Sequence, residues 1–199
     1  NENGTVGSWA TTTSLPFVNA HFGMVTSNGF MYVVGGFGLA GSRSNTIQYT
    51  AINANGTLGA TWTTSTNLFT NARNEHITMA YNGYIYITGG STGATVLNDV
   101  QYTLLNPATG APGPWATNAT SFTTPRRDHA GIVYGGYMYV MAGCPTIEGT
   151  CGVGPLSDVQ YAPISSADGS VGSWTTATNP SIGTRWLSKA TADKGYIYF

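Results

Sequence analysis

The chain has 199 residues and a formal net charge of −1, and charged residues make up only 8% of it. A typical soluble domain carries about 25% charged residues; here Thr, Ser, Asn and Gly take their place. The seven basic residues are scattered along the chain, so no positive stripe is available for a phosphate backbone, and we do not expect nucleic acid as a partner. No apolar run approaches the roughly 18 residues that a membrane helix needs.

One sequence pattern recurs four times along the chain, with a period of 53 to 59 residues. Each copy carries an apolar run, followed by a glycine pair at 35–36 and 89–90 that becomes Ala-Gly at 142–143. A tryptophan marks every copy: Trp9, Trp62, Trp115 and Trp174. Repeats of this length built from short strands are typical of propeller blades. We therefore expect an all-β fold, a β-propeller of four-stranded antiparallel blades.

The first two strands of each repeat are expected to form a hairpin. In repeat one, residues 21–26 and 30–34 flank Asn28-Gly29, and this dipeptide favours a type I′ turn because both central residues need positive φ. Equivalent turns lie at 82–83, 135–136 and 194–195. The second strand is almost wholly apolar, at 30–34, 84–87, 137–141 and 196–199. Because it lacks polar alternation, we expect both of its faces to be buried.

The third and fourth strands complete each predicted blade. The third strand lies at 46–51, 99–104 and 158–164, and it carries a tyrosine in each case: Tyr49, Tyr102 and Tyr161. A second turn leads into the strand with the tryptophan, which we expect to pack between adjacent blades. The polar connections from each fourth strand to the next blade are the expected carriers of function.

The repeats divide a single segment, 1–199, into unequal parts. These are a blade remnant at 1–12, whole blades at 13–65, 66–118 and 119–177, and a partial blade at 178–199. About 3.5 blades cannot close a ring, and an open end would expose an apolar strand edge. We expect further blades of the same polypeptide to complete a ring of roughly seven, since rings of four to eight occur. The alternative is closure by a second copy of the chain.

The two cysteines, Cys144 and Cys151, lie in the segment that makes repeat three about six residues longer than its neighbours. A disulfide between them would close an eight-residue loop and stabilise the fold by roughly 2.5 kcal/mol in the chain-entropy model. Such a bond indicates an oxidising compartment, so we expect an extracellular or cell-surface protein. Two reduced surface thiols are the alternative.

The landmarks of the repeat resemble those of the kelch-repeat superfamily. The resemblance rests on the apolar second strand, the glycine doublet, the Asp-Val-x-Tyr motifs at 99–102 and 158–161, the tryptophan, and Arg-x-x-His before the first strand. Tyr and Trp lie 13 residues apart, wider than in typical animal kelch repeats. The long hairpin between them is similar to kelch-like propellers of secreted or surface-attached bacterial proteins. The resemblance implies a propeller used for binding, and no single activity.

Three histidines, His21, His76 and His129, are interpreted as equivalent residues at the start of the first strand in successive repeats, with Ser188 in the fourth. Three imidazoles could form a metal site if all of them leaned toward the axis. Because the repeat spreads them around the ring, we favour a structural role in which each hydrogen-bonds to the neighbouring blade. We expect no metal site and no cofactor.

Arginines recur three residues before the histidine position, with Val18 in that place of repeat one. In this charge-poor chain they could line one mouth of the channel and bind a carboxylate or sulfate bidentately. On this interpretation the candidate ligand-binding residues are Arg73, Arg126, Arg127, Arg185 and Trp186. The alternative is a set of ion pairs that fixes the sheets, with carboxylates drawn from Asp99, Asp128 and Asp158.

The leading hypothesis is a non-catalytic propeller module of a secreted or cell-surface protein that binds a protein or glycan through its blade-connecting loops. One alternative is part of the propeller of a carbohydrate-active or oxidative enzyme, with catalytic residues in other blades; another is a structural unit of a surface layer or filament. Kelch-like copper oxidases need a Tyr–Cys cross-link and axial histidines, and both cysteines here fall in an inserted loop. The eight acidic residues give no convincing carboxylate pair for glycoside hydrolysis.

Overall fold

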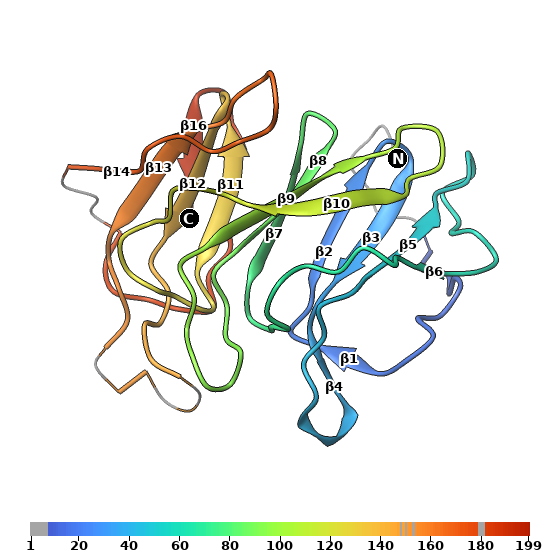
Figure 1. Cartoon of the computed structure of the whole chain (residues 1–199), viewed down its shortest axis with the longest axis horizontal. Coiled ribbons are helices and arrows are strands. Elements are labelled where there is room, and N and C mark those ends of the chain that lie inside the picture. The colour runs from blue at the N-terminus through green and yellow to red at the C-terminus, as the bar shows by residue number, and fades with distance from the viewer. Residues whose placement is uncertain (1–7, 148, 150, 153, 179–181) are drawn as a thin grey trace.

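The computed structural model describes residues 8–147, 149, 151–152, 154–178 and 182–199, and within them the regular structure is almost entirely β (Figure 1). The exception is a single 3-10 turn, η1 (Leu39–Gly41). The expected all-β fold with four-stranded antiparallel sheets is thus confirmed. Within the described ranges, no helix is long and apolar enough to cross a membrane.

Three four-stranded sheets follow one another along the chain, each an antiparallel meander in which consecutive strands pair. The first contains β2 (Gly23–Ser27), β3 (Phe30–Val34), β5 (Ile47–Ala51) and β6 (Thr63–Thr64). The second contains β7 (Ile77–Tyr81), β8 (Tyr84–Thr88), β9 (Val100–Leu105) and β10 (Pro112–Thr117). The third contains β11 (Ala130–Tyr134), β12 (Tyr137–Met141), β13 (Val159–Pro163) and β14 (Thr175–Thr176).

Two smaller sheets complete the described structure. β15 (Thr191–Asp193) pairs with β16 (Tyr196–Tyr198) as the first hairpin of a fourth repeat. β1 (Asn19–Ala20) pairs with β4 (Phe37–Gly38), an addition that the sequence pattern did not predict. The strand expected in the remnant 1–12 is not seen in residues 8–12, where Trp9 is 90% exposed; residues 1–7 lie outside the described part.

The hairpin turns have the expected backbone geometry. Asn28 and Gly29 have φ values of 51° and 77°, and Asn82 and Gly83 have values of 51° and 81°. Positive φ at both central residues is what a type I′ turn requires. In the third repeat the doublet position tolerates Ala142 at φ 53°, so the Ala-Gly variant keeps the left-handed backbone of Gly-Gly.

The sheets pack side by side through their first strands. β2 contacts β7, β7 contacts β11, and β11 contacts β15. Two apolar clusters fill the junctions between the large sheets, one around Tyr32 and Phe69 and the other around Tyr86 and Phe122. The Tyr32 hydroxyl donates to the Gly110 carbonyl of the next sheet at 2.9 Å, and Tyr86 donates likewise to a hairpin glycine of the third sheet.

Two of the four tryptophans that mark the repeats lie in these junctions as predicted. The Trp115 ring meets Phe69 edge-on with centroids 5.3 Å apart, and Trp174 meets Phe122 at 5.5 Å. Trp62, in the first sheet, is half-buried and donates to the Thr13 carbonyl at 3.4 Å. The apolar edge-to-face pairs therefore belong to the junctions that have a large sheet on both sides.

Phe122→Ala tests the importance of these junctions. Phe122 is 0% exposed, so the substitution should lower the free energy of unfolding by about 3–5 kcal/mol through lost burial and a cavity. Urea unfolding followed by tryptophan fluorescence measures the change. Phe17→Ala is the matched control, since Phe17 is 40% exposed; equal losses in the two variants would contradict the packing described.

Candidate functional site

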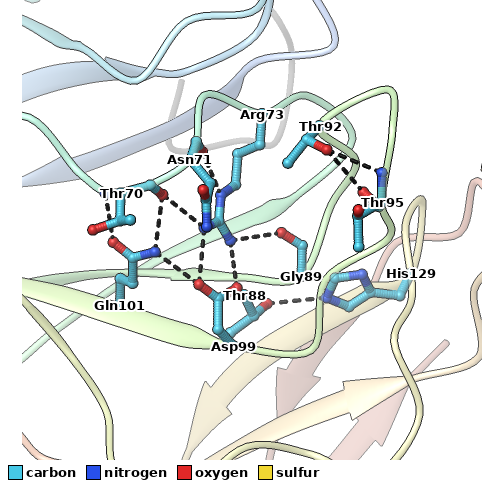
Figure 2. A network of polar contacts seen from close by, with 10 residues as sticks. All are labelled: Thr70, Asn71, Arg73, Thr88, Gly89, Thr92, Thr95, Asp99, Gln101 and His129. Atoms are coloured by element: carbon cyan, nitrogen blue, oxygen red, sulfur yellow. Dashed lines mark hydrogen bonds and ion pairs between the residues drawn. The ribbon is translucent and has the colours of Figure 1, made fainter.

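Arg73 lies between two sheets and is 0% exposed. Its guanidinium donates bidentately to Asp99, with Nη1 to Oδ1 at 2.6 Å and Nη2 to Oδ2 at 2.8 Å. Nη1 also donates to the Gly89 carbonyl at 2.9 Å, while the Arg73 carbonyl accepts from the Gly36 amide of the preceding sheet at 2.9 Å. The side-chain part of this network is drawn in Figure 2. The side chain of Arg73 thus holds its own sheet and the backbone holds the neighbour.

Arg126 repeats the arrangement one sheet further along. Its Nη1 and Nη2 donate to Asp158 at 2.9 and 2.8 Å, and Nη1 donates to the Ala142 carbonyl at 2.8 Å. The Arg126 carbonyl accepts from the Gly90 amide at 2.9 Å. Burial disfavours the charged form of Asp158, but hydrogen bonds from Arg126 and Gln160 outweigh it and lower the pKa of this carboxyl.

These contacts correct the interpretation of Arg73 and Arg126 as ligand-binding residues. Both guanidinium groups are fully buried, and intramolecular acceptors occupy them. The ion pairs with Asp99 and Asp158, which were the alternative, are what the structure shows. The spacing of the arginines predicts a repeated role, and that role is to hold adjacent sheets together.

Arg127 is also buried, but its guanidinium lies at the end of the sheets where the first strands begin, an end called here the first-strand end. Its Nη1 donates to Asp128 Oδ2 at 2.7 Å and to Glu75 Oε2 at 3.2 Å. Nε donates to the Thr146 carbonyl at 2.8 Å and Nη2 to the Gly149 carbonyl at 3.1 Å. Arg127 therefore connects two carboxylates of neighbouring sheets to the inserted loop of repeat three.

The last two candidates, Arg185 and Trp186, lie just before β15. Arg185 is exposed, and its guanidinium lies 5.2 Å from the ring centroid of Phe199. Trp186 is half-buried, with the guanidinium of Arg127 5.3 Å from its ring centroid. Both side chains are thus more accessible than the three arginines before them, but each already has a cation–π partner.

Cys144 and Cys151 form the predicted disulfide, with their Cα atoms 5.7 Å apart. Cys144 is buried, and its backbone exchanges two hydrogen bonds of 2.9 Å with Arg127. The inserted loop is therefore closed covalently at its base and attached to the first-strand end of the third sheet.

The three histidines are not equivalent, because the alignment of repeat one was shifted by one residue. Counted back from the hairpin turns, His21 shares its place with Glu75 and Asp128. All three have positive φ, at 52°, 57° and 50°. His76 and His129 follow this place by one residue. The prediction of three symmetric histidines is therefore wrong for His21.

The same shift changes two other assignments in repeat one. Phe22 takes the histidine place, and Asn19 rather than Val18 takes the arginine place. The Asn19 side chain donates from Nδ2 to the Gly35 carbonyl at 2.8 Å, as the arginines of later repeats do to their own doublets. A short amide thus replaces the guanidinium in the first repeat.

His129 makes the predicted hydrogen bond to the neighbouring sheet. Its Nε2 lies 3.0 Å from the Thr88 hydroxyl, as Figure 2 shows. His76 has Val34, without a hydroxyl, in the place of that threonine. Nδ1 of His129 has no hydrogen-bond partner. The two ring nitrogens of His76 lack a well-formed hydrogen bond as well, although the Val34 backbone lies near enough to interact with this ring.

Both buried imidazoles are held in their neutral form. Burial, reinforced by the charge of Arg73, lowers the pKa of His76 to about 3. Burial and the charge of Arg126 lower the pKa of His129 well below its usual value. Neither imidazole therefore carries a charge at neutral pH.

A cavity of about 150 Å³ opens where the starts of β2, β7 and β11 meet the segment before β15. A second cavity of about 420 Å³ shares part of its wall, including His76 and Lys189, and continues along the first strands. The polar residues that line the first cavity are His21, Glu75, His76, Asp128, His129, Ser188 and Lys189.

Backbone hydrogen bonds connect the cavity-lining residues of one sheet to those of the next. The Glu75 amide donates to the His21 carbonyl at 3.1 Å, the Asp128 amide to the Glu75 carbonyl at 2.9 Å, and the Leu187 amide to the Asp128 carbonyl at 2.8 Å. The side-chain ligand atoms of His21, Glu75 and Asp128 all lie within 4.8 Å of one another. Burial and the nearby charge of Glu75 raise the pKa of Asp128 to about 6, although Arg127 opposes this.

The sequence reasoning missed Glu75, Asp128 and Lys189 as site residues. The signal was present, since counting back from the hairpin turns places His21, Glu75, Asp128 and Leu187 in one column. That column varies in chemistry, whereas the place two residues before it is an arginine in three of the four repeats, and sites on repeat folds appear where the repeat is broken.

Comparison with known proteins gives a likeness of fold only. No protein-family model matches the chain, and no curated protein does. Among solved structures, the chain is similar to one described as "Structure of YjhT", with a TM-score of 0.67 and 14% sequence identity. The match covers 89% of this chain and 57% of the other, so the chain spans little more than half of that protein's length.

Arg126→Met should lower the free energy of unfolding by about 3–5 kcal/mol, because it leaves Asp158 without its buried partner. Adding Asp158→Leu should recover part of the loss. Denaturant unfolding measures both variants, and Arg185→Met, at an exposed arginine, should change stability by no more than about 0.5 kcal/mol. Equal losses of stability in Arg126→Met and Arg185→Met would refute the role of Arg126 in holding adjacent sheets together.

The protein should lose stability on acidification through His76. Its folded-state pKa of about 3 lies below the unfolded value of about 6.5, so the unfolded chain takes up the proton first as the pH falls. The stability is complete above about pH 6.5, and each lower pH unit down to about 3 should cost about 1.4 kcal/mol. Asp128, whose pKa is raised, acts with the opposite sign.

His76→Gln isolates the histidine contribution. The free energy of unfolding between pH 7 and pH 5 should fall less steeply in this variant than in the wild type. Phe17→Ala, at an exposed residue without a titratable group, serves as the control and should retain the wild-type slope. Identical slopes for the wild type and His76→Gln would show that the buried imidazole is not responsible.

Proposed function

We propose that the chain is a segment of a kelch-type β-propeller that serves as a non-catalytic binding module of a secreted or cell-surface protein, with a glycan as its ligand. The observation that supports this best is the polar cavity at the first-strand end. It combines hydrogen-bond donors and acceptors within one concave surface, and the segments that lead into the first strands line it.

The packing of the sheets supports the propeller part of the proposal. Successive antiparallel meanders contact one another through their first strands, in the order β2, β7, β11 and β15. In a propeller the first strand of each blade lies nearest the axis. The likeness to a longer solved chain fits a ring that further blades of the same polypeptide complete, with a second copy of the chain as the alternative.

The disulfide supports the proposed location. Structural disulfides persist in oxidising compartments and are rare in the cytosol, and Cys144–Cys151 closes a loop that the fold holds in place. Together with the few charges and the abundant Thr and Asn, it favours a secreted or surface-displayed protein.

The chemistry of the cavity favours a glycan over an anionic ligand. The carboxylates of Glu75 and Asp128 accept hydrogen bonds, the exposed Lys189 donates them, and Arg127 compensates part of the negative charge. Sugar hydroxyl groups need both donors and acceptors. The first cavity with its adjoining space of about 420 Å³ can accommodate a sugar residue, since small-ligand sites span roughly 300–1,000 Å³.

Screening the protein on a glycan array, followed by calorimetric titration of the strongest ligand, tests the proposal. Asp128→Asn and Lys189→Ala should each weaken binding at least tenfold, because both side chains line the cavity. Asp168→Asn is the matched control; this exposed aspartate lies in the hairpin between β13 and the tryptophan strand, at the opposite end of the sheet. It should bind as the wild type does.

Two outcomes would count against the glycan. Absence of binding to every glycan on the array, with binding to a protein partner instead, would replace the glycan by a protein ligand. Equal weakening by Asp168→Asn and Asp128→Asn would move the binding surface away from the cavity.

A further inference from the structure

His21, Glu75 and Asp128 form a ligand set that a divalent cation could use. Each comes from a different repeat, and their ligand atoms lie within 4.8 Å of one another. Two ligand atoms of one tetrahedral Zn²⁺, bound at about 2.0–2.2 Å, lie about 3.3–3.6 Å apart. The side chains therefore need to approach by up to about 1.5 Å, which rotamer changes of the three side chains can supply.

The local charge leaves room for a cation. Arg127 contacts Oε2 of Glu75 and Oδ2 of Asp128, one oxygen of each carboxylate. A single guanidinium thus compensates two carboxylates that lie close together. Lys189 also lines the cavity, but it is exposed and its long side chain can turn outward.

The cavity wall supplies a second, independent observation. His76 is 4% exposed and His129 is 1% exposed, and both line the same cavity as the three ligand residues. Nδ1 of His129 has no hydrogen-bond partner, and the Val34 backbone alone lies near enough to act on a ring nitrogen of His76. Buried polar atoms normally have a partner. A buried imidazole nitrogen in the wall of a polar cavity is a place where a water or a polar ligand, such as a hydrated ion, can supply the missing hydrogen bond.

We propose that this cavity is a binding site for a divalent transition-metal ion of the Zn²⁺ type, held by the His21 imidazole and one carboxylate oxygen each of Glu75 and Asp128. One imidazole with two carboxylates suits Zn²⁺ better than Ca²⁺, which takes six to eight oxygen ligands. Three protein ligands leave a coordination position for water or for a ligand oxygen. The site does not depend on whether the protein binds glycans.

Calorimetric titration of the metal-free protein with Zn²⁺ alone tests the proposal. One ion should bind per chain, and Ca²⁺ should bind at least tenfold more weakly. Glu75→Gln and Asp128→Asn should each weaken Zn²⁺ binding at least tenfold, because each removes a charged ligand. Asp168→Asn, which alters an exposed carboxylate far along the sheet, should leave the affinity unchanged.

A measurement on the wild type covers the case in which a variant fails to fold. Addition of paramagnetic Co²⁺ should selectively broaden the nuclear magnetic resonance signals of His21, Glu75 and Asp128. The proposal is overturned if the wild type binds no Zn²⁺, if both variants bind it as tightly as the wild type, or if Co²⁺ broadens signals elsewhere. Since no sugar is present, these results are separate from any failure of the glycan proposal.

Discussion

The segment just before each first strand carries the connection between neighbouring sheets. At three successive junctions the arginine carbonyl of this segment accepts a hydrogen bond of 2.9 Å from the glycine doublet of the preceding sheet. At two of these junctions the arginine is Arg73 or Arg126. Its buried guanidinium donates to the doublet of its own sheet and to an aspartate of that same sheet. A buried guanidinium is stable only when its donors are satisfied. The same segment therefore fixes the position of the sheet and forms its ion pair. The residues that follow it in the chain line the cavity.

Much of the fold could be predicted because its determinants are local. Asn28-Gly29 and Asn82-Gly83 set hairpins through positive φ, and β3 has the predicted bounds because five successive apolar residues end at a glycine doublet. The repeat then multiplies each local signal, so that an ambiguous strand in one copy is clear in the next. The first strand of repeat one was less well bounded, beginning at Gly23 rather than at His21.

The site was less predictable because its contacts join distant parts of the chain. Arg73 pairs with Asp99 and Arg126 with Asp158 across 26 and 32 residues, and a spacing pattern alone does not distinguish such a pair from two surface charges. His21 and His76 are the same residue type, but His21 has the backbone position of Glu75. Placing the two histidines together therefore concealed that Glu75 corresponds to His21. Counting from the hairpin turns, whose geometry is fixed by steric limits, restores the column that brings His21, Glu75 and Asp128 together.

The inserted loop of repeat three helps to fix the position of the Arg127 side chain. Carbonyls of Thr146 and Gly149 hold its guanidinium from one side, while Glu75 and Asp128 hold it from the other. The covalent link between Cys144 and Cys151 closes that loop, so it restrains the two carbonyls that accept hydrogen bonds from the Arg127 guanidinium. Reduction of the disulfide would release this restraint on one side of the guanidinium and leave the two carboxylates on the other.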